Sequence, residues 1–448
     1  MAGYPHRSRA PTRGAQRGQA IIFTVVLIAL GVLAAIYTTV SSTSVSISNR
    51  QSENTAKVLL EVKQVLIGWS VGRDPASDGT NARPGELPCP DINPLDGYED
   101  GSCVAGALGR VPWKTLRIPE PKDAAGETLW YTVAGSFRKY DNSTAPITSS
   151  TLGDITVYQD STATTLTTQA VAVIFAAGAP LGTQDRSSTT TMTCSAPSGT
   201  YTRNVCAENY LETVGGVNNA TINGPFIRAQ SSSTFNDRLQ VITNVDLMPV
   251  VEQRVAREII SLLNSYRTVT GIYPWADLAD GDSNGNEFSA AYNRNRFPCG
   301  NALPTDWDSG GTPKLPNWLT NGCWATGWTS IIYYAVARNR LKNSGTGCTT
   351  CSASSLTVNN PSSLPGIQCT TGSPPTCTST VITAGSADLV LITPGAATAN
   401  PHGNWPTNWS AITGYFEDGE NSDNDNSDDT YVVPTSTLNN RDRIFIVR

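Results

Sequence analysis

The sequence predicts an α+β protein made of two tandem units, each with a long helix followed by short strands. Three observations support this prediction. An uncharged stretch continues into an amphipathic helical pattern, short β-branched and aromatic runs follow it, and the same order of features then occurs a second time. The 448 residues are enough for more than one domain.

Residues 20–40 contain no charged side chain. A helix of this length, at about 1.5 Å per residue, covers the ~30 Å hydrocarbon core of a bilayer. Residues 1–18 contain four arginines and no acid, a charge bias that keeps a leader in the cytoplasm. We therefore expect a cytoplasmic leader over 1–18, a membrane-spanning half-helix over 19–40, and the remaining chain outside.

The composition suits an exported protein. There are 31 Lys and Arg against 37 Asp and Glu, a net charge of −6. Without the four leader arginines, 27 basic residues face 37 acidic ones, so the remainder is near −10. This acidity argues against a nucleic-acid partner. All ten cysteines follow residue 40, which favours an oxidising compartment and up to five disulfides.

The helical pattern continues beyond the uncharged stretch. Apolar residues recur at a spacing of three to four at Val58, Leu59, Val62, Val65, Leu66 and Trp69. Residues 41–48 are poor helix formers, so a break there is one alternative. The other is a continuous helix from Gln19 to about Ser70, ~50 residues and ~75 Å long, with its second half packed on a domain.

Strands are predicted over 129–134, 169–175 and 235–242, where β-branched and aromatic residues cluster. The spacing of Cys89 and Cys103 predicts a bridge that pins an irregular, proline-rich loop, and Cys194 and Cys206 are expected to close a second loop.

The order of features is then repeated. A second amphipathic helix runs over 251–266, without an uncharged extension. The run beginning at Leu129 precedes that at Ile332 by 203 residues (332 − 129), and the run at Asn236 precedes that at Arg441 by 205 (441 − 236). Two pairs at nearly one offset indicate duplication. We expect a first domain over 41–247 and a second over 248–448.

The N-terminal segment resembles a known family. Arg17-Gly18, the apolar run with Leu30-Gly-Val-Leu-Ala-Ala-Ile36, and the later Arg83-Pro-Gly-Glu-Leu-Pro-Cys89 resemble type IV pilins, type II secretion pseudopilins and related prepilin-like proteins. The resemblance implies cleavage between Gly18 and Gln19 by a prepilin peptidase. It also implies a long N-terminal helix packed on an antiparallel sheet, here with a pilin-type head duplicated in tandem.

Two departures from that family refine the expectation. Gln19 replaces the usual phenylalanine, and Phe23 stands where the family has a glutamate that neutralises a neighbouring subunit's amine. The resemblance then implies a minor or tip subunit of a pilus or secretion pseudopilus, contacting other pilin-like subunits through its N-terminal helix. The expected location is the bacterial inner membrane, single-pass, with the bulk periplasmic or in an extracellular filament.

Catalytic motifs are scarce, and the sequence predicts that the protein is not an enzyme. The two histidines are His6 and His402, the latter in a turn without a nucleophile motif.

Cys348 and Cys351 could form a redox pair or half a zinc site, but a structural bridge is favoured in an exported chain. Cys299 and Cys323 are also expected in bridges, and the pairing is open among Cys348, Cys351, Cys369 and Cys377.

One acidic loop matches the first half of a calcium site. Its oxygen side chains alternate before a glycine turn at Asp280, Asp282, Asn284, Asn286 and Glu287. Ala291 occupies the position of the closing glutamate, so a solvated acidic loop is the favoured interpretation, with calcium as the alternative. The acidic stretch 418–429 is a second, weaker candidate.

Tryptophans concentrate in the second repeat, at Trp307, Trp318, Trp324, Trp328, Trp405 and Trp409. Core packing is the favoured role, and a sugar- or protein-binding face is the alternative. The alternative function is accordingly a surface adhesin or binding module displayed on a pilin-type anchor. An exported enzyme is the third and least supported class.

Overall fold

The computed structural model describes residues 43–73, 82–139, 146–274, 276, 293–297, 328, 331–341, 356–360, 365–393, 395, 430–433 and 442–448. The chain forms two compact units, Met1–Thr55 and Ala56–Arg448, and each is considered by itself. The described part of the first unit is the beginning of one helix. All contacts discussed below lie within the second unit.

Two α-helices occur in the described residues, α2 (Thr43–Val71) and α4 (Asn244–Thr270). A capping box sets the start of α4, because Thr243 and Asp246 exchange side-chain and backbone hydrogen bonds. Gly271 ends the helix at φ 81°, where its N–H donates to the Arg267 carbonyl. The buried face follows a helical spacing through Val251, Val255, Ile259, Leu263 and Tyr266.

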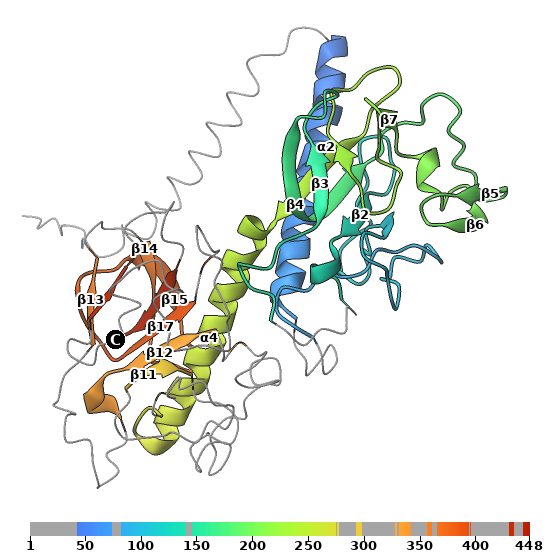
Figure 1. The fold of residues 1–448 in the computed structure, drawn as a ribbon. Coiled ribbons are helices and arrows are strands. Elements are labelled where there is room, and N and C mark those ends of the chain that lie inside the picture. Colours follow the sequence, from blue (N-terminus) through green and yellow to red (C-terminus); the bar gives the residue numbers. More distant parts are fainter. Residues whose placement is uncertain are drawn as a thin grey trace, which may run out of the picture. The chain divides into compact units, whose positions relative to one another are not determined.

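The first six-stranded sheet lies in the N-terminal half of the second unit (Figure 1). Its strands run in the order β1-β2-β4-β3-β9, and β10 also pairs with β4. All pairs are antiparallel except β3 with β9. The strands are β1 (Leu108–Arg110), β2 (Trp130–Val133), β3 (Ile155–Tyr158), β4 (Thr165–Ala176), β9 (Phe226–Ile227) and β10 (Arg238–Thr243).

A second six-stranded sheet follows α4 and curls into a half-barrel (Figure 1). Its order is β11-β12-β17-β19-β14-β15, with β14 parallel to β19. A three-stranded sheet, β16-β13-β18, contains the parallel pair β13 and β18. The strands are β11 (Arg294–Arg296), β12 (Tyr333–Val336), β13 (Leu356–Asn359), β14 (Pro365–Cys369), β15 (Cys377–Val381), β16 (Gly385–Ala387), β17 (Leu389–Thr393), β18 (Thr430–Val432) and β19 (Arg443–Val447).

Both faces of this second sheet are buried. On β12, Tyr334 and Val336 join the main core with residues of α4, whereas Tyr333 and Ala335 join a separate core with β13. Because successive strand residues point to opposite faces, one strand serves both cores. This explains why its sequence is continuously apolar rather than alternating.

Short elements complete the described chain. Two hairpins are formed by β5 (Thr191–Cys194) with β6 (Gly199–Thr202), and by β7 (Thr213–Val214) with β8 (Val217–Asn218). Three 3₁₀ turns are η1 (Gly135–Phe137), η2 (Ala207–Asn209) and η5 (Arg338–Arg340).

The same order of strand pairing occurs twice. The antiparallel series β1-β2-β4-β10 in the first half has its counterpart in β11-β12-β17-β19. Each series includes a 3₁₀ turn after its second strand, and each has one parallel bridge, Leu87 with Arg138 and Tyr273 with Leu341. The two halves therefore share a pairing order as well as a sequence spacing.

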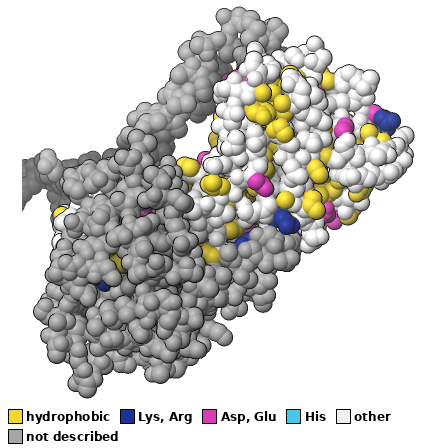
Figure 2. Space-filling view, viewed as in Figure 1, with side chains coloured by type: hydrophobic (Ala, Val, Ile, Leu, Met, Phe, Trp, Pro, Cys, Tyr) yellow, Lys and Arg dark blue, Asp and Glu magenta, His cyan; other side chains and the backbone are white. Residues whose placement is uncertain are grey.

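One core runs through both halves. Its buried side chains include Leu66 of α2, Val173 of β4, Leu263 of α4 and Phe445 of β19. On the described part of the face shown in Figure 2, hydrophobic side chains form small groups among other side chains and backbone, and charged side chains are sparse. This agrees with the 15% of charged residues in the chain.

The predicted fold class is wrong. We expected a long N-terminal transmembrane and amphipathic helix packed on an antiparallel sheet, duplicated in tandem. The described chain instead is sheet-rich, with two α-helices and three sheets that include parallel pairs. Helix α2 is described over the 29 residues Thr43–Val71, and the rest of the ~50-residue helix that the sequence allows lies outside the described residues. Local periodicity predicted the central strands β2, β4, β10, β12 and β19, but not the parallel pairs, whose partners are distant in sequence.

The predicted localisation is also corrected. We expected a single-pass bacterial inner-membrane protein, but no helix among the described residues is both long and apolar enough to cross a bilayer. Helix α2 has Arg50, Glu53, Lys57, Glu61 and Lys63 along its length, and such charges are costly in lipid. Residues 19–40, which prompted the expectation, lie outside the described residues.

Candidate interaction site on helix α2

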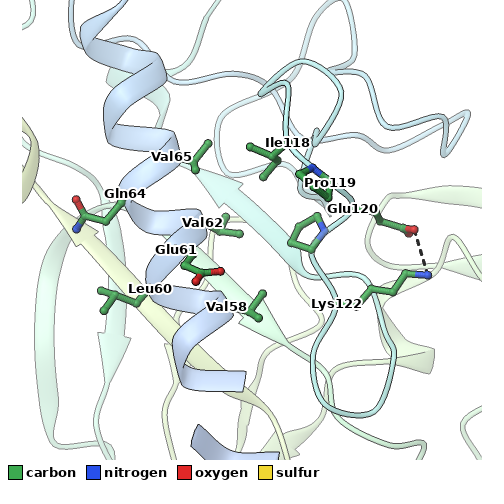
Figure 3. A pocket seen from close by; sticks show the side chains of 11 residues that line it. Val58, Leu60, Glu61, Val62, Gln64, Val65, Ile118, Pro119, Glu120 and Lys122 are labelled. Carbon is green, nitrogen blue, oxygen red and sulfur yellow. Dashed lines mark ion pairs between the residues drawn. The ribbon is translucent and has the colours of Figure 1, made fainter. Parts of the chain in front are cut away.

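A groove of about 820 Å³ lies between α2 and the segment Ile118–Lys122 (Figure 3). Both walls belong to the second unit. Its lining is mostly apolar and consists of Val58, Leu60, Glu61, Val62, Gln64, Val65, Ile118, Pro119, Glu120, Pro121 and Lys122.

The helix wall follows from the helical repeat. Val58, Val62 and Val65 stand at i, i+4 and i+7, so they share one face and point toward the facing segment in Figure 3. Val62 is buried in the core, while Val58 and Val65 are half-buried and pack against it. Leu60 and Gln64 point to the other side of the helix.

The second wall is an extended segment held in place by its backbone. Prolines at 119 and 121 fix the local φ angles. The Ile118 N–H donates to the Trp113 carbonyl (3.0 Å), and the Leu129 N–H donates to the Pro121 carbonyl (3.1 Å). The groove is therefore bounded on this side by a constrained chain rather than by a free loop.

Charges lie on the rim of the groove. Lys122 pairs with Glu120 at 3.1 Å, with both side chains partly exposed. Burial raises the pKa of Glu120, but hydrogen bonds from Thr128 and Lys122 outweigh it and leave the pKa below its usual value. Lys57 and Glu61 form an exposed pair one turn along the helix. An apolar floor with a charged rim suits binding of a protein segment.

The described residues show no group of side chains arranged as in a catalytic site. They contain no group of three or more His, Cys, Asp and Glu side chains that could hold a metal ion. Both histidines, His6 and His402, lie outside the described residues. The expectation that the protein is not an enzyme stays a prediction.

Most of the predicted site residues also lie outside the described residues. These are the processing pair Gly18 and Gln19, the five oxygen ligands Asp280, Asp282, Asn284, Asn286 and Glu287, and five of the six tryptophans of the second repeat. The sixth, Trp328, is 1% exposed and belongs to the core. Calcium binding stays a prediction.

Disulfide bonds are confirmed. The described residues contain three, Cys89–Cys103, Cys194–Cys206 and Cys369–Cys377. The last pairing, left open by the sequence, closes the β14–β15 hairpin, where the two cysteines are opposite each other. The other four cysteines, Cys299, Cys323, Cys348 and Cys351, lie outside the described residues.

Sequence reasoning missed the buried charges. Lys63 of α2 contacts Asp246 of α4 at 2.9 Å, and Glu252 of α4 forms an ion pair with Arg443 of β19. The partners are far apart in sequence, so no local pattern joins them. The one available signal was Thr243 three residues before Asp246, which is the spacing of a capping box.

Comparison of the chain with known protein families, curated proteins and solved structures gives no match.

Proposed function

We propose that the protein is a structural subunit of a filament of the type IV pilus or type II secretion kind, present as a minor or tip component. The observation that carries the proposal is the apolar groove beside α2. It gives this helix a binding surface for another subunit. The proposed processing step is cleavage between Gly18 and Gln19 by a prepilin peptidase.

Three further features support a structural role. The helix next to the groove directly follows the uncharged stretch 20–40 and its arginine-containing leader. The head is cross-linked by disulfides, which suits a component exposed to an oxidising environment. The corrected fold alters the proposal, because the head contains parallel strand pairs that the duplicated antiparallel unit we expected does not have.

Two experiments test the proposal. N-terminal mass spectrometry of the mature protein should find a chain that begins at Gln19, and an intact Met1 would contradict it. In the second experiment, the full chain with Val58→Cys is treated with a thiol cross-linker in its native cells. We expect a cross-link to another filament subunit.

The matched control for cross-linking is Leu152→Cys. Leu152 is 47% exposed and does not line the groove. It should react with a monofunctional thiol reagent without forming the cross-linked product. Equal cross-linking from both positions would mean that the groove is not a specific contact, and no cross-link at Val58 would overturn its assigned role.

A further inference from the structure

Two carboxylic acids are buried together in the first half of the second unit. Asp237, immediately before β10, is 1% exposed, and Glu212, immediately before β7, is 8% exposed. They also contact each other's backbone, because the Glu212 N–H donates to Asp237 Oδ2 (2.9 Å) and the Asp237 N–H donates to Glu212 Oε2 (3.2 Å). The pair joins the β7–β8 hairpin to the beginning of β10.

The hydrogen-bond donors are divided unequally between the two acids. Glu212 accepts three bonds, from the N–H groups of Asn236 (2.9 Å) and Asp237 and from the side chain of Gln184 (2.9 Å). On Asp237 both donors, the Glu212 N–H and Asn219 Nδ2 (3.0 Å), reach Oδ2. Asp237 Oδ1 is buried and accepts no hydrogen bond from the described residues.

This division indicates where a proton sits. A carboxylate that accepts several N–H bonds is stabilised in its charged form, which describes Glu212. A buried carboxyl oxygen that accepts no hydrogen bond is costly when the carboxyl is charged. In the protonated acid the same oxygen can carry the hydrogen and donate a bond. Burial, together with the charge of Glu212, raises the pKa of Asp237 well above its usual value.

The surrounding charged groups are engaged elsewhere. Arg186 donates to Gln184 Oε1 (3.0 Å) and pairs with Glu127 (3.0 Å). Asp185 pairs with Arg203 (3.5 Å). On the Asn236 side, Asp123 accepts the Gly178 N–H (2.8 Å). Arg186 and Arg203 therefore already have carboxylate partners.

We propose that Asp237 and Glu212 form a proton-sharing pair, in which the neutral acid of Asp237 donates to the Glu212 carboxylate and holds the β7–β8 hairpin against β10. Loss of this proton as the pH rises places two negative charges together in a buried site. The hairpin then separates from β10, so the segment is a pH-sensitive element of the head.

The sign of the pH dependence follows from linkage. A carboxyl whose pKa is raised on folding retains a proton that the unfolded chain has already lost above about pH 4. Its contribution to stability is present at low pH and is lost as the pH rises through the folded-state pKa. Asparagine at position 237 mimics the neutral acid and does not titrate.

The test compares the full wild-type chain with Asp237→Asn from pH 4 to pH 9. The difference in thermal midpoint, variant minus wild type, should be near zero at pH 4 and grow to at least roughly 2–4 °C at pH 9. Asp160→Asn is the control, because Asp160 lies on the surface and should leave the alkaline slope unchanged.

Two results would overturn the proposal. One is an equal effect of Asp237→Asn at every pH, which is what an ordinary charged carboxylate would give. The other comes from the wild-type chain itself and needs no variant to fold. Nuclear magnetic resonance of ¹³C-labelled aspartate should show the Asp237 carboxyl carbon titrating well above the usual range of an aspartate, and titration within that range, near pH 4 or below, would exclude a shared proton.

Discussion

Lys63 of α2 lies 2.9 Å from Asp246, in the first turn of α4, and its Nζ also donates to the Val241 carbonyl of β10 (3.0 Å). One lysine, 8% exposed, thus connects the helix of the first half to the strand and helix where the two halves meet. Because Asp246 also belongs to the capping box of α4, the ion pair supports the start of that helix.

We expect Lys63→Met to lower the free energy of unfolding by about 1–3 kcal/mol, because it removes one donor from the partly buried Asp246 carboxylate and one from the Val241 carbonyl. Burial raises the pKa of Asp246, but Lys63 and Thr243 outweigh this and hold it below its usual value. The stability that the charged Asp246 contributes is therefore present above about pH 4 and is lost as the pH falls further. In the variant, this loss of stability in acid should be smaller.

Urea unfolding between pH 2 and pH 7 measures both effects. Lys57→Met is the matched control on the same helix, since Lys57 pairs with Glu61 at 3.7 Å with both side chains mostly exposed. That control should change stability by less than about 1 kcal/mol. Similar losses for the two variants would contradict the structural role of Lys63.

A second buried pair connects α4 with the last strand. Glu252, 1% exposed, pairs with Arg443 and accepts a hydrogen bond from Ser149 of the first half. Burial lowers the pKa of Arg443 to about 10. We expect Glu252→Gln to cost up to about 3 kcal/mol, because it leaves the partly buried Arg443, whose side chain is 26% exposed, without its carboxylate partner.

The double variant Glu252→Met with Arg443→Met should recover much of that loss, because both charges of the pair are removed together. Chemical unfolding of the single and double variants gives the coupling energy. Glu258→Gln, in the more exposed pair with Arg254 on the same helix, is expected to cost no more than about 1 kcal/mol. A double variant less stable than Glu252→Gln would refute the argument.

The groove beside α2 gives a prediction about assembly. Val58→Asp places a charge on its apolar wall and should abolish incorporation of the protein into filaments. Stability should fall by no more than about 1–2 kcal/mol, since Val58 is only half-buried. Filament fractionation and thermal melting measure the two effects separately, and Leu152→Asp on another exposed surface should assemble normally.

Two glycines with the same backbone conformation allow the cost of backbone strain to be measured separately from the cost of a steric contact. Gly97 and Gly126 both have φ of +88°, but a Cβ on Gly97 would lie 2.6 Å from the Trp113 indole, whereas a Cβ on Gly126 would meet no atom within 4 Å. Gly126→Ala should cost about 1 kcal/mol through strain. Gly97→Ala should cost about 1–3 kcal/mol more through overpacking, and equal losses in urea unfolding would show that the indole moves aside.

The Cys89–Cys103 bridge closes the loop that contains Gly97. The paired cysteines are 14 residues apart, and removal of a bridge of this span costs about 3 kcal/mol by the chain-entropy argument. We expect that loss for Cys89→Ser with Cys103→Ser in urea unfolding. The shorter Cys369–Cys377 link, with a separation of 8, should cost less when removed, and the reverse order would contradict a purely entropic role.

Several elements were predictable from the sequence because their signals are local. The spacing of Val251, Val255 and Ile259 predicted the helix that became α4 (Asn244–Thr270). The β-branched and aromatic runs at 129–134 and 332–337 became β2 and β12. The offsets between repeated runs predicted a duplication, which stays a prediction, and the structure adds that two series of strands share one pairing order.

Tertiary structure alone decided the rest, because the interacting residues are distant in the chain. The parallel pairing of β14 with β19, which contributes to the departure from the predicted antiparallel fold, depends on the register between residues 365–369 and 443–447. The groove needs α2 and Ile118–Lys122 side by side. No sequence spacing predicts the contact of Lys63 with Asp246 or that of Asp237 with Glu212. Sequence thus determined the helices and strands by local propensity, and long-range packing decided which of their charged and apolar side chains meet.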